Sequence, residues 1–339
     1  MNFFEDFAVG RVFRHATPRT LTTGDAAAYI ALTGARHVVH CAEPVAKALG
    51  HRACPLDDFL VFNVAFGKTV PDISYNAIAN LGYADVRFTA PVYAGDTLAC
   101  ESSVIGLKQN SNGRSGVVYV KSVARNQDGH AVLSWIRWVM VARRAEGAAP
   151  ATTVPPLPAE VPAASLAVPQ FLRAQGLSIE ATGGSRQWDD YAPGEVIDHP
   201  GRMVVEEADH MAATRLYQNP ARVHFDADND FGKRLVYGGH VISVCRALSH
   251  DGLENAFAVV AIHGGSHANP TFGGDTLACR HVVTAREELP GRRDVGVLRL
   301  RMLGVKDEPL ARLPAVAPGE KHPAVVLDLD YSVLIPRRQ

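Results

Sequence analysis

Residues 87–100 read RFTAPVYAGDTLAC, and residues 266–279 read SHANPTFGGDTLAC. The two stretches share the proline and the whole Gly-Asp-Thr-Leu-Ala-Cys run. Two further pairs keep the same order along the chain: FFEDFAVGRVFRH at 3–15 pairs with WDDYAPGEVIDH at 188–199, and WVMVARR at 138–144 pairs with SVLIPRR at 332–338. A period this long exceeds the roughly 20–50 residues of a solenoid unit. The sequence therefore predicts one complete domain present twice.

The composition agrees with two globular domains and excludes several classes of function. The chain has 339 residues, of which 47% are hydrophobic, and its net charge is −1, so bulk charge gives no reason to expect a nucleic-acid or membrane partner. The first residues lack a cationic start followed by an apolar run, and no apolar run approaches the ~20 residues that span a bilayer. Five cysteines without a CxxC pair indicate reduced thiols. We therefore expect a cytoplasmic protein.

An Ala/Pro-rich segment at 145–169 separates the two copies. Proline lacks the amide hydrogen and fixes φ, so this segment is expected to be an extended, semi-rigid connector. The predicted domains are residues 1–144 and 170–339. A connector of this length lets the second copy lie against the first, as a dimer within one chain.

Within each copy, helical patterns come first and strand patterns follow. The predicted helices cover residues 22–33, 44–49 and 56–66 in copy one, and 205–217 and 240–249 in copy two. The predicted strands cover residues 85–89, 97–107, 116–125 and 131–141, and then 276–285, 295–303 and 325–333. The run 56–66 is apolar nearly all round, which is typical of a buried helix. Asn112-Gly113 and Asp128-Gly129 predict tight hairpin turns. The pattern indicates an α+β fold, with a curled antiparallel sheet around one buried helix in each copy.

These features together resemble a known family. A D/N-x-x-x-x-H element, a buried helix preceded by glycine and then F-x-x-P-V-x-x-G-D-T-L are similar to the MaoC-like hydratase branch of the hot-dog fold. The resemblance covers nearly the whole chain in two copies. NFFEDF, FGKTVPDISYNAIANLGYADVRF, ARVHF and VYGGH are most similar to the branch that interconverts β-methylmalyl-CoA and mesaconyl-CoA. The resemblance implies a double hot-dog and a lyase that reversibly hydrates an acyl-CoA thioester, with no cofactor beyond the substrate's own CoA.

The family resemblance also implies which copy is catalytic. Members carry a D-x-N-P-x-H-type segment whose Asp and His, five residues apart, form the acid/base pair. Aligned on His224, this chain has Asn219 in place of the Asp; aligned on His40, copy one has Ala35. An amide cannot act as a general base, but Asn219 can hydrogen-bond the histidine, the substrate hydroxyl or a water. We therefore expect His224 to be the acid/base in copy two, with Asn219 as the orienting group.

The remaining expected site residues also follow from the resemblance. Gly239, in VYGGH, stands where family glycines donate a backbone amide to the thioester oxygen. Copy one has Asp57-Asp58 at the matching place, next to the developing negative charge. Copy one is therefore predicted to be a non-catalytic half that holds the acyl-CoA, with His40 contacting substrate.

A cation should meet the second carboxylate of β-methylmalyl-CoA, and Arg222 and Lys68 are the candidates. No metal is expected, because the histidines are scattered and the H-x-x-H at residues 37–40 lacks further ligands.

Structural alternatives stand beside these assignments. His224 lies in an apolar context typical of a core histidine, Asn219-Pro220 is also a turn signal, and Asp57 or Asp58 could simply cap the buried helix. Because the family's Asp is missing, a hot-dog thioesterase and a non-catalytic acyl-CoA-binding protein remain as alternative functions. One chain is expected to be the minimal active unit, with homo-oligomers possible.

Overall fold

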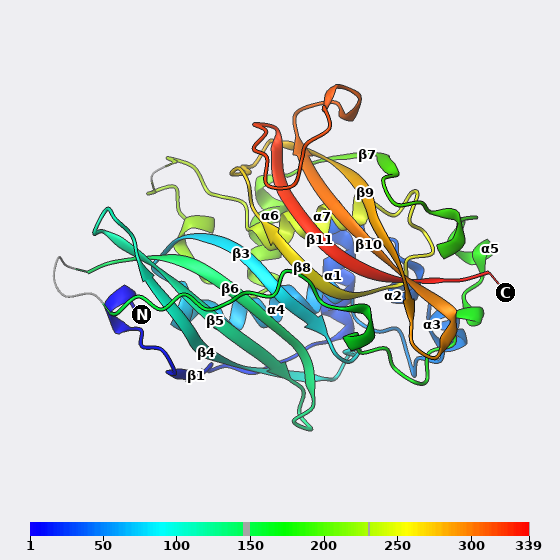
Figure 1. Cartoon of the computed structure of the whole chain (residues 1–339), viewed down its shortest axis with the longest axis horizontal. Coiled ribbons are helices and arrows are strands. Elements are labelled where there is room, and N and C mark those ends of the chain that lie inside the picture. The colour runs from blue at the N-terminus through cyan, green and yellow to red at the C-terminus, as the bar shows by residue number, and fades with distance from the viewer. Residues whose placement is uncertain (145–149, 230, 339) are drawn as a thin grey trace.

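One continuous antiparallel sheet runs through both copies of the repeat (Figure 1). A computed structural model of the chain describes residues 1–144, 150–229 and 231–338. Its sheet has eleven strands in the order β1-β4-β5-β6-β3-β8-β11-β10-β9-β7, with β2 beside β4. The strands are β1 Val12–Arg14, β2 Arg19–Thr20, β3 Ala77–Phe88, β4 Thr97–Gln109, β5 Ser115–Arg125, β6 Ala131–Ala142, β7 Val196–Val204, β8 Ala258–Ser266, β9 Thr276–Leu289, β10 Arg292–Lys306 and β11 Val325–Pro336.

The two copies meet at the antiparallel pair β3 and β8, where Val86 lies opposite Ile262. On either side of this pair the strands follow the same order: β6, β5, β4 and β1 in one direction, and β11, β10, β9 and β7 in the other. The sheet therefore has a pseudo-twofold relation between its halves, as expected for two hot-dog units joined along their edges.

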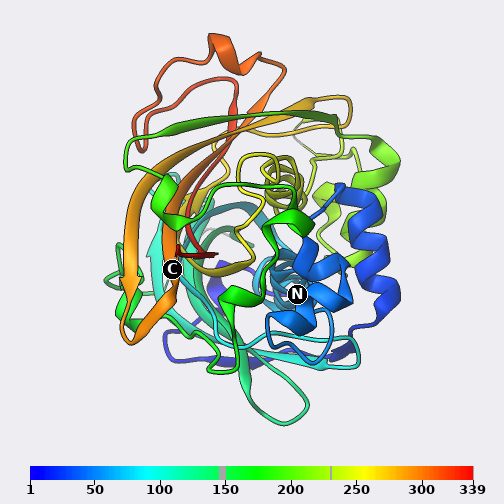
Figure 2. The ribbon, with the colours of Figure 1, turned by 90° about the vertical axis from the view of Figure 1, so that its right-hand side faces the viewer.

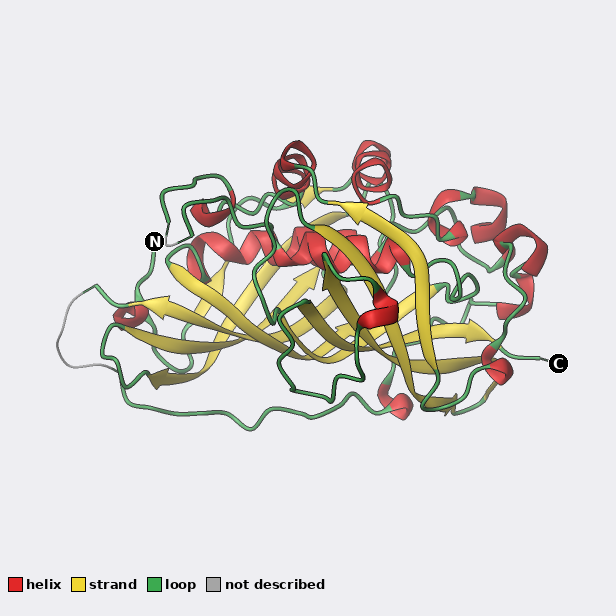
Figure 3. Ribbon diagram, turned by 90° about the horizontal axis from the view of Figure 1, so that it is seen from above, coloured by secondary structure: helices red, strands yellow, loops and turns green. Residues whose placement is uncertain are grey.

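Two helices lie inside the curve of this sheet, one from each copy. They are α4 (Asp58–Ile73) and α7 (Gly238–Leu248). Figure 2 shows the sheet curving around them, and Figure 3 shows them crossing one face of the strands. The paired helices α1 (Thr23–Thr33) and α6 (Glu207–Leu216) cover α7 on the side away from the sheet. The short helices are α2 Val38–Cys41, α3 Glu43–Ala48 and α5 Ile179–Thr182.

The composition of α4 explains its central position. From Phe59 to Val70 every residue is buried, including Asn63 and Lys68, so the helix has no polar face to present to water. The predicted buried helix at 56–66 is thus confirmed, but the helix continues to Ile73. Pro71 lies in the last turn, so the one bond that its missing amide hydrogen removes is near the end of the helix.

Local hydrogen bonds define the ends of these elements. Thr22 and Asp25 form a capping box at the start of α1, and the side chain of Asp57 caps α4 by accepting from the Phe59 amide at 2.9 Å. The repeated Gly-Asp-Thr turns are alike: the Asp96 carboxylate accepts from the Tyr93 amide, and Asp275 accepts from that of Phe272. The capping alternative is therefore confirmed for Asp57.

Four strands lay outside the sequence prediction: the short strands β1 and β2, and the longer strands β7 and β8. Strand β7 contains Pro200, which interrupts its pairing with β9 between Asp198 and Arg202. A proline is tolerated there because β7 is an edge strand. Strand β8 was missed because AVVAIHGGS does not alternate and carries two glycines. Strand β3 begins eight residues earlier than predicted, at Ala77.

The described part of the connector, from residue 150 onward, crosses the outer face of the sheet (Figure 1). Thr153 pairs with Leu107 of β4, and the Val161 amide donates to Nδ1 of His263 on β8. These contacts agree with an extended segment, although residues 145–149 of the predicted connector lie outside the described residues and its bounds stay a prediction. None of the helices in the described ranges is long and apolar enough to cross a membrane.

Candidate active site

A cavity of about 270 Å³ lies between the two halves of the chain. The first half contributes α4, β3 and β6 to its wall. The second half contributes the segment before α7, the first turn of α7 and the loop after β8. Its polar wall residues include Asn80, Tyr83, Arg137, Asn219, His224, Gly238 and His267. The cavity thus brings Asn219 and His224 together, as the sequence predicted for these two residues.

His224 is held in a defined tautomer. It is buried and ends a short 3-10 turn, and its Nδ1 lies 2.8 Å from the Leu235 carbonyl oxygen. A carbonyl oxygen can only accept, so Nδ1 carries the proton and Nε2 carries the lone pair. Burial lowers the pKa of His224 to about 4. The imidazole is therefore neutral at pH 7, with a basic nitrogen that has no hydrogen-bond partner among the described residues.

Asn219 is buried beside the same cavity, and its amide orientation is also fixed. Its Oδ1 accepts from the Ala221 amide at 3.0 Å. The oxygen is thereby used within the local turn, and the Nδ2 group is left as a donor. Asn219-Pro220 thus forms a turn, and the Asn219 side chain still lines the cavity, while its role as the orienting group stays a prediction.

The first turn of α7 contributes to the cavity wall. The amides of Gly238 and Gly239 have no intrahelical acceptor, because they precede the first bond of the helix, which joins the His240 or Val241 amide to the Tyr237 carbonyl. Gly238 lines the cavity, whereas Gly239 is not among the lining residues. A Cβ on Gly239 would lie 1.9 Å from Oδ1 of Asn63 on α4. Gly239 therefore allows close packing of the two central helices, and Gly238 offers the nearer amide.

Three further polar residues in the wall were missed from the sequence. The Tyr83 hydroxyl and Nε2 of His267 are 3.0 Å apart, and burial lowers the pKa of His267 to about 4. Both side-chain polar atoms of Asn80 are buried without a hydrogen-bond partner in the part of the chain that the structure describes. A signal was present for one of them: within the repeat, His267 stands where copy one has Phe88. A polar residue replacing an aromatic one in a repeated motif marks the copy that carries chemistry.

Arg137 was also missed. It lies on β6 within the apolar run AVLSWIRWVMVA, is 1% exposed and lines the cavity. A charged residue in such a run is rarely buried without a function or a partner. An arginine inside an apolar strand pattern could therefore have marked this position in the sequence.

The structure places the three predicted substrate-binding residues away from the cavity wall. Arg222 is exposed and pairs with Asp226 at 3.4 Å. Lys68 is buried and donates to the side chain of Gln218, next to Asn219. His40 lines a separate cavity of about 50 Å³, to which both halves also contribute. None of the three is a lining residue of the cavity that contains His224.

The smaller cavity is the pseudo-symmetric counterpart of the larger one. Nδ1 of His40 contacts the Pro55 carbonyl at 3.0 Å, just as His224 contacts that of Leu235. The carboxylate of Asp58, at the start of α4, accepts from the Val259 amide at 2.7 Å. Residues of the connector also line this smaller space. The first copy thus keeps the histidine, but Asp58 and residues of the connector occupy the space beside it.

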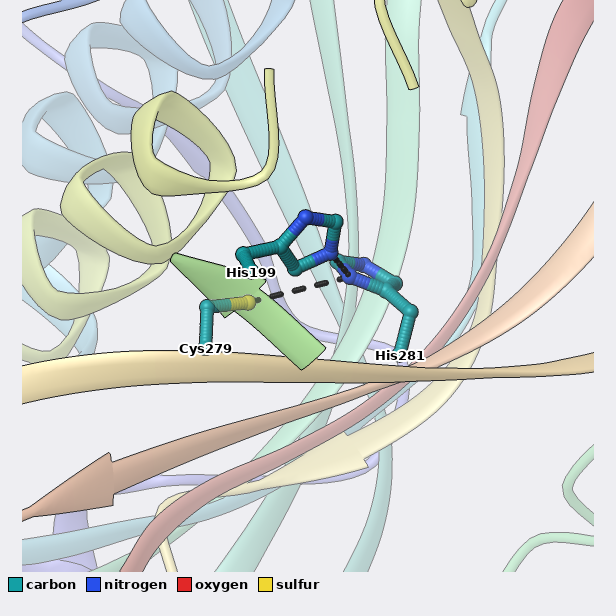
Figure 4. Close-up of side chains that lie close together, drawn as sticks. All are labelled: His199, Cys279 and His281. Atoms are coloured by element: carbon teal, nitrogen blue, oxygen red, sulfur yellow. Dashed lines mark hydrogen bonds between the residues drawn. The ribbon is translucent and has the colours of Figure 1, made fainter. Parts of the chain in front are cut away.

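In the described part of the chain, one group of side chains is close enough to hold a metal: His199, Cys279 and His281 (Figure 4). The two imidazoles are hydrogen-bonded at 2.8 Å, and their outer nitrogens contact the Asp251 carbonyl and the Tyr331 hydroxyl. Hydrogen bonds therefore account for every ring nitrogen.

Copy one has a similar link at the matching place, where Nε2 of His15 lies 2.8 Å from the Ser102 hydroxyl. We interpret the histidine pair as the equivalent structural connection between β7 and β9. It lies apart from the residues that line the cavity.

Comparison with known proteins agrees with this geometry. The family model for mesaconyl-CoA hydratase matches residues 1–165. A β-methylmalyl-CoA dehydratase from Chloroflexus aurantiacus is 52% identical, with 99% of this chain and 97% of the relative covered. The chain belongs to the mesaconyl-CoA hydratase family. A mesaconyl-CoA hydratase from Cereibacter sphaeroides is 50% identical, with 99% and 98% covered.

Solved structures of similar proteins have the same architecture. A putative MaoC domain dehydratase from Chloroflexus aurantiacus superimposes with a TM-score of 0.96 at 52% identity, covering 100% of this chain and 98% of the other. A conserved hypothetical protein of Mycobacterium tuberculosis with a double hot-dog fold gives a TM-score of 0.80 at 25% identity, covering 99% and 98%. The predicted α+β double hot-dog and the MaoC-like resemblance are thereby confirmed.

Proposed function

We propose that this protein is a hydro-lyase that interconverts mesaconyl-CoA and β-methylmalyl-CoA by reversible addition of water. One observation carries the proposal: the neutral, buried His224, whose Nδ1 is bound to the Leu235 carbonyl, lines the same cavity as Gly238, the first residue of α7. That arrangement offers a base and an oxyanion site to one substrate, and the relatives that cover nearly the whole chain carry the names of this reaction.

The thioester oxygen is assigned to the start of α7. Addition of water to the double bond moves negative charge onto this oxygen, and an amide that is already oriented stabilises it without rearrangement. The amide of Gly238 is the donor that we favour, because Gly238 lines the cavity. The helix dipole of α7 has its positive end there as well.

The reacting water is assigned to His224 and Asn219. The Nδ2 group of Asn219 donates to the water oxygen, and Nε2 of His224 accepts a water proton. The hydroxide equivalent bonds to the β-carbon, the double-bond electrons move onto the thioester, and the α-carbon then takes the proton from the imidazolium. Dehydration runs through the same steps in reverse. In this scheme Asn219 positions water and does not accept a proton.

The other half is assigned a supporting role. Its cavity is about 50 Å³ against about 270 Å³, and Asp58 places a carboxylate where Gly238 leaves an open amide. A carboxylate there would repel a developing oxyanion. The first half instead supplies α4, β3 and β6 to the wall of the active cavity, so one chain is the minimal active unit.

We propose further that the reaction needs no cofactor beyond the CoA of the substrate and takes place in the cytoplasm. The proton transfers and the oxyanion site described above require only protein groups. All five cysteines are free thiols, which agrees with a reducing compartment. Association of whole chains would leave this site complete in each copy.

The test is incubation of the purified full-length protein with mesaconyl-CoA, followed by loss of the enoyl-thioester absorbance and by mass. A product heavier by one water with its thioester intact is the expected result. Release of free CoA would instead assign a thioesterase. Binding of mesaconyl-CoA without turnover, with crotonyl-CoA also inert, would assign an acyl-CoA-binding protein.

A further inference from the structure

A buried arginine in the cavity wall has no acidic partner. Arg137 is 1% exposed, and one of its terminal nitrogens donates to the hydroxyls of Thr69 (2.9 Å) and Ser74 (3.2 Å). Its guanidinium carbon lies 4.1 Å from the centroid of the Phe66 ring. Its Nε has no hydrogen-bond partner, and among the described residues no aspartate or glutamate forms an ion pair with it.

This environment leaves the positive charge uncompensated. Burial lowers the pKa of Arg137 to about 10, so the side chain is still cationic at neutral pH. A buried cation without an anion is costly, and neutral hydroxyls and an aromatic ring offset only part of that cost. Such a group is suited to an anion that arrives with a ligand.

The other buried arginines of the described chain are satisfied differently. Arg301 forms two hydrogen bonds with the Asp328 carboxylate, each 2.8 Å. Arg246 on α7 donates to the Ala256 carbonyl at 2.7 Å and to the Ser249 hydroxyl. Neither of these two arginines lines the cavity that contains His224. Arg137 therefore combines burial, an unused donor and access to the cavity.

We propose that Arg137 receives the free carboxylate of the acyl chain and thereby selects a dicarboxylic acyl-CoA. The proposal rests on the proposed function, because it assigns the acyl end of a substrate whose thioester lies at α7. A guanidinium presents several N–H groups in a plane that matches a carboxylate. The unused Nε is one of these donors.

The chemistry of the substrate gives the contact a second consequence. In mesaconyl-CoA the free carboxylate is attached to the β-carbon, the atom that water attacks. Its negative charge opposes the approach of an electron-rich oxygen. Pairing with Arg137 reduces that repulsion, so the residue should affect the rate as well as binding. A short-chain enoyl-CoA that lacks the carboxylate gains nothing from the arginine.

The other candidate cations meet these conditions less well. Arg222 is exposed and already pairs with Asp226, and Lys68 is engaged with Gln218. Neither lines the cavity. The position of Arg137 on β6, opposite Tyr83 of β3, puts its charge in the wall of the reaction space itself.

The test compares Arg137→Gln with the wild-type full-length protein on mesaconyl-CoA and crotonyl-CoA. We expect kcat/KM for mesaconyl-CoA to fall about 30- to 100-fold, as for loss of a charge-assisted pair, and kcat/KM for crotonyl-CoA to change less than about 3-fold. Arg246→Gln is the matched control, since it removes a buried arginine from the other central helix. Arg246→Gln should change kcat/KM by the same factor for both substrates. Equal losses on both substrates for Arg137→Gln would overturn the proposal.

A binding measurement separates this proposal from the proposed function. Saturated succinyl-CoA and butyryl-CoA differ mainly in the carboxylate and cannot be hydrated. The wild-type protein should bind succinyl-CoA at least about 10-fold more tightly, and Arg137→Gln should remove the preference. If Arg137→Gln fails to fold, Arg137→Lys should keep part of the preference. Equal binding of the two thioesters by the wild type would refute the role of Arg137, whatever the result with mesaconyl-CoA.

Discussion

The carboxylate of Asp58 accepts a hydrogen bond from the backbone amide of Val259 at 2.7 Å and so closes the start of α4. The counterparts of these two residues are Gly238, which begins α7, and Asn80 on β3. The strand register supports the match, because Asn80 pairs with Val139 of β6 and Val259 pairs with Val333 of β11. Both counterparts line the large cavity. The bond that fills one half of the molecule is therefore missing from the other half, where the space is open.

The two histidines with the same carbonyl contact provide a matched pair of variants. His224→Ala should lower kcat for mesaconyl-CoA hydration by about 10²–10⁴-fold, because it removes the proton acceptor. His40→Ala should leave kcat within about 3-fold, because His40 lines the small cavity. Steady-state kinetics with circular dichroism as a check of folding would decide. A comparable loss in both variants would mean that the first half also takes part in the reaction.

Asn219 allows the role of an amide donor to be separated from that of a base. Asn219→Ala removes the donor and should lower kcat about 10- to 100-fold. Asn219→Asp keeps the acceptor for the Ala221 amide, but its charge should raise the pKa of His224 and move the acid limb of the pH–rate profile upward. A full set of pH–rate profiles would test this. An Asn219→Asp profile that matches the wild type would place Asn219 outside the reacting set.

The fold could be predicted from the sequence because the motifs that define the repeated domain occur in both copies. The Gly-Asp-Thr turns, the buried helix and the hairpins at Gly113 and Gly129 rest on local patterns, and all of them are present. Strands β7 and β8 were missed because their identity depends on position in the sheet. Pro200 is acceptable only on an edge. In β8 a Cβ on Gly265 would lie 2.5 Å from Cδ1 of Leu329, so the neighbouring strand leaves no room for a side chain there.

The candidate site was only partly predictable for a related reason. His224 and Asn219 lie in one short motif, so a local alignment could find them. Arg137, Tyr83 and Asn80 come from the other half of the chain, and only the pairing of β3 with β8 brings them to the same cavity. Arg222 was chosen as a cation because it lies beside the His224 motif, and Lys68 because it lies at the end of the buried helix. Neither criterion measures closeness across a pseudo-twofold axis.

The first turn of α7 can be tested by adding one methyl group. In Gly238→Ala the new Cβ would lie 2.4 Å from Cε1 of His267, so either that ring or the helix start must move. We expect kcat/KM to fall at least about 100-fold, with a modest cost in stability of about 1–3 kcal/mol from overpacking. The measurements are steady-state kinetics and urea unfolding.

Gly24→Ala is the control for this variant, since Gly24 also lies in the first turn of a helix. Its nearest neighbour, the Thr22 hydroxyl, would be at an ordinary 3.4 Å. Its activity should be unchanged and its stability equal or higher by up to about 1 kcal/mol. Full activity of Gly238→Ala would move the oxyanion site away from α7.

The buried histidines predict how stability depends on pH. Burial lowers the pKa of five histidines from 6.5 to about 4 each: His51, His224, His240, His263 and His267. Between these values the unfolded chain binds protons that the folded chain does not, so the free energy of unfolding should fall as the pH drops from 6.5 towards 4. Asp58 acts in the opposite sense, because burial raises its pKa to about 6. Five histidines outweigh this one carboxyl group, so the net free energy of unfolding decreases as the pH falls.

The midpoint of thermal unfolding should therefore decrease between pH 7 and pH 5. The decrease should correspond to a loss on the order of several kcal/mol in the free energy of unfolding. His240→Leu should show a smaller decrease, since it removes one buried imidazole that takes no part in the proposed reaction. His130→Gln changes an exposed histidine and should keep the wild-type slope. If the midpoint is constant over this range, the folded and unfolded chains bind equal numbers of protons, so the buried imidazoles titrate near 6.5 and burial does not lower their pKa. The acid limb of the pH–rate profile, which His224 sets as the base, would then lie near 6.5 and not near 4.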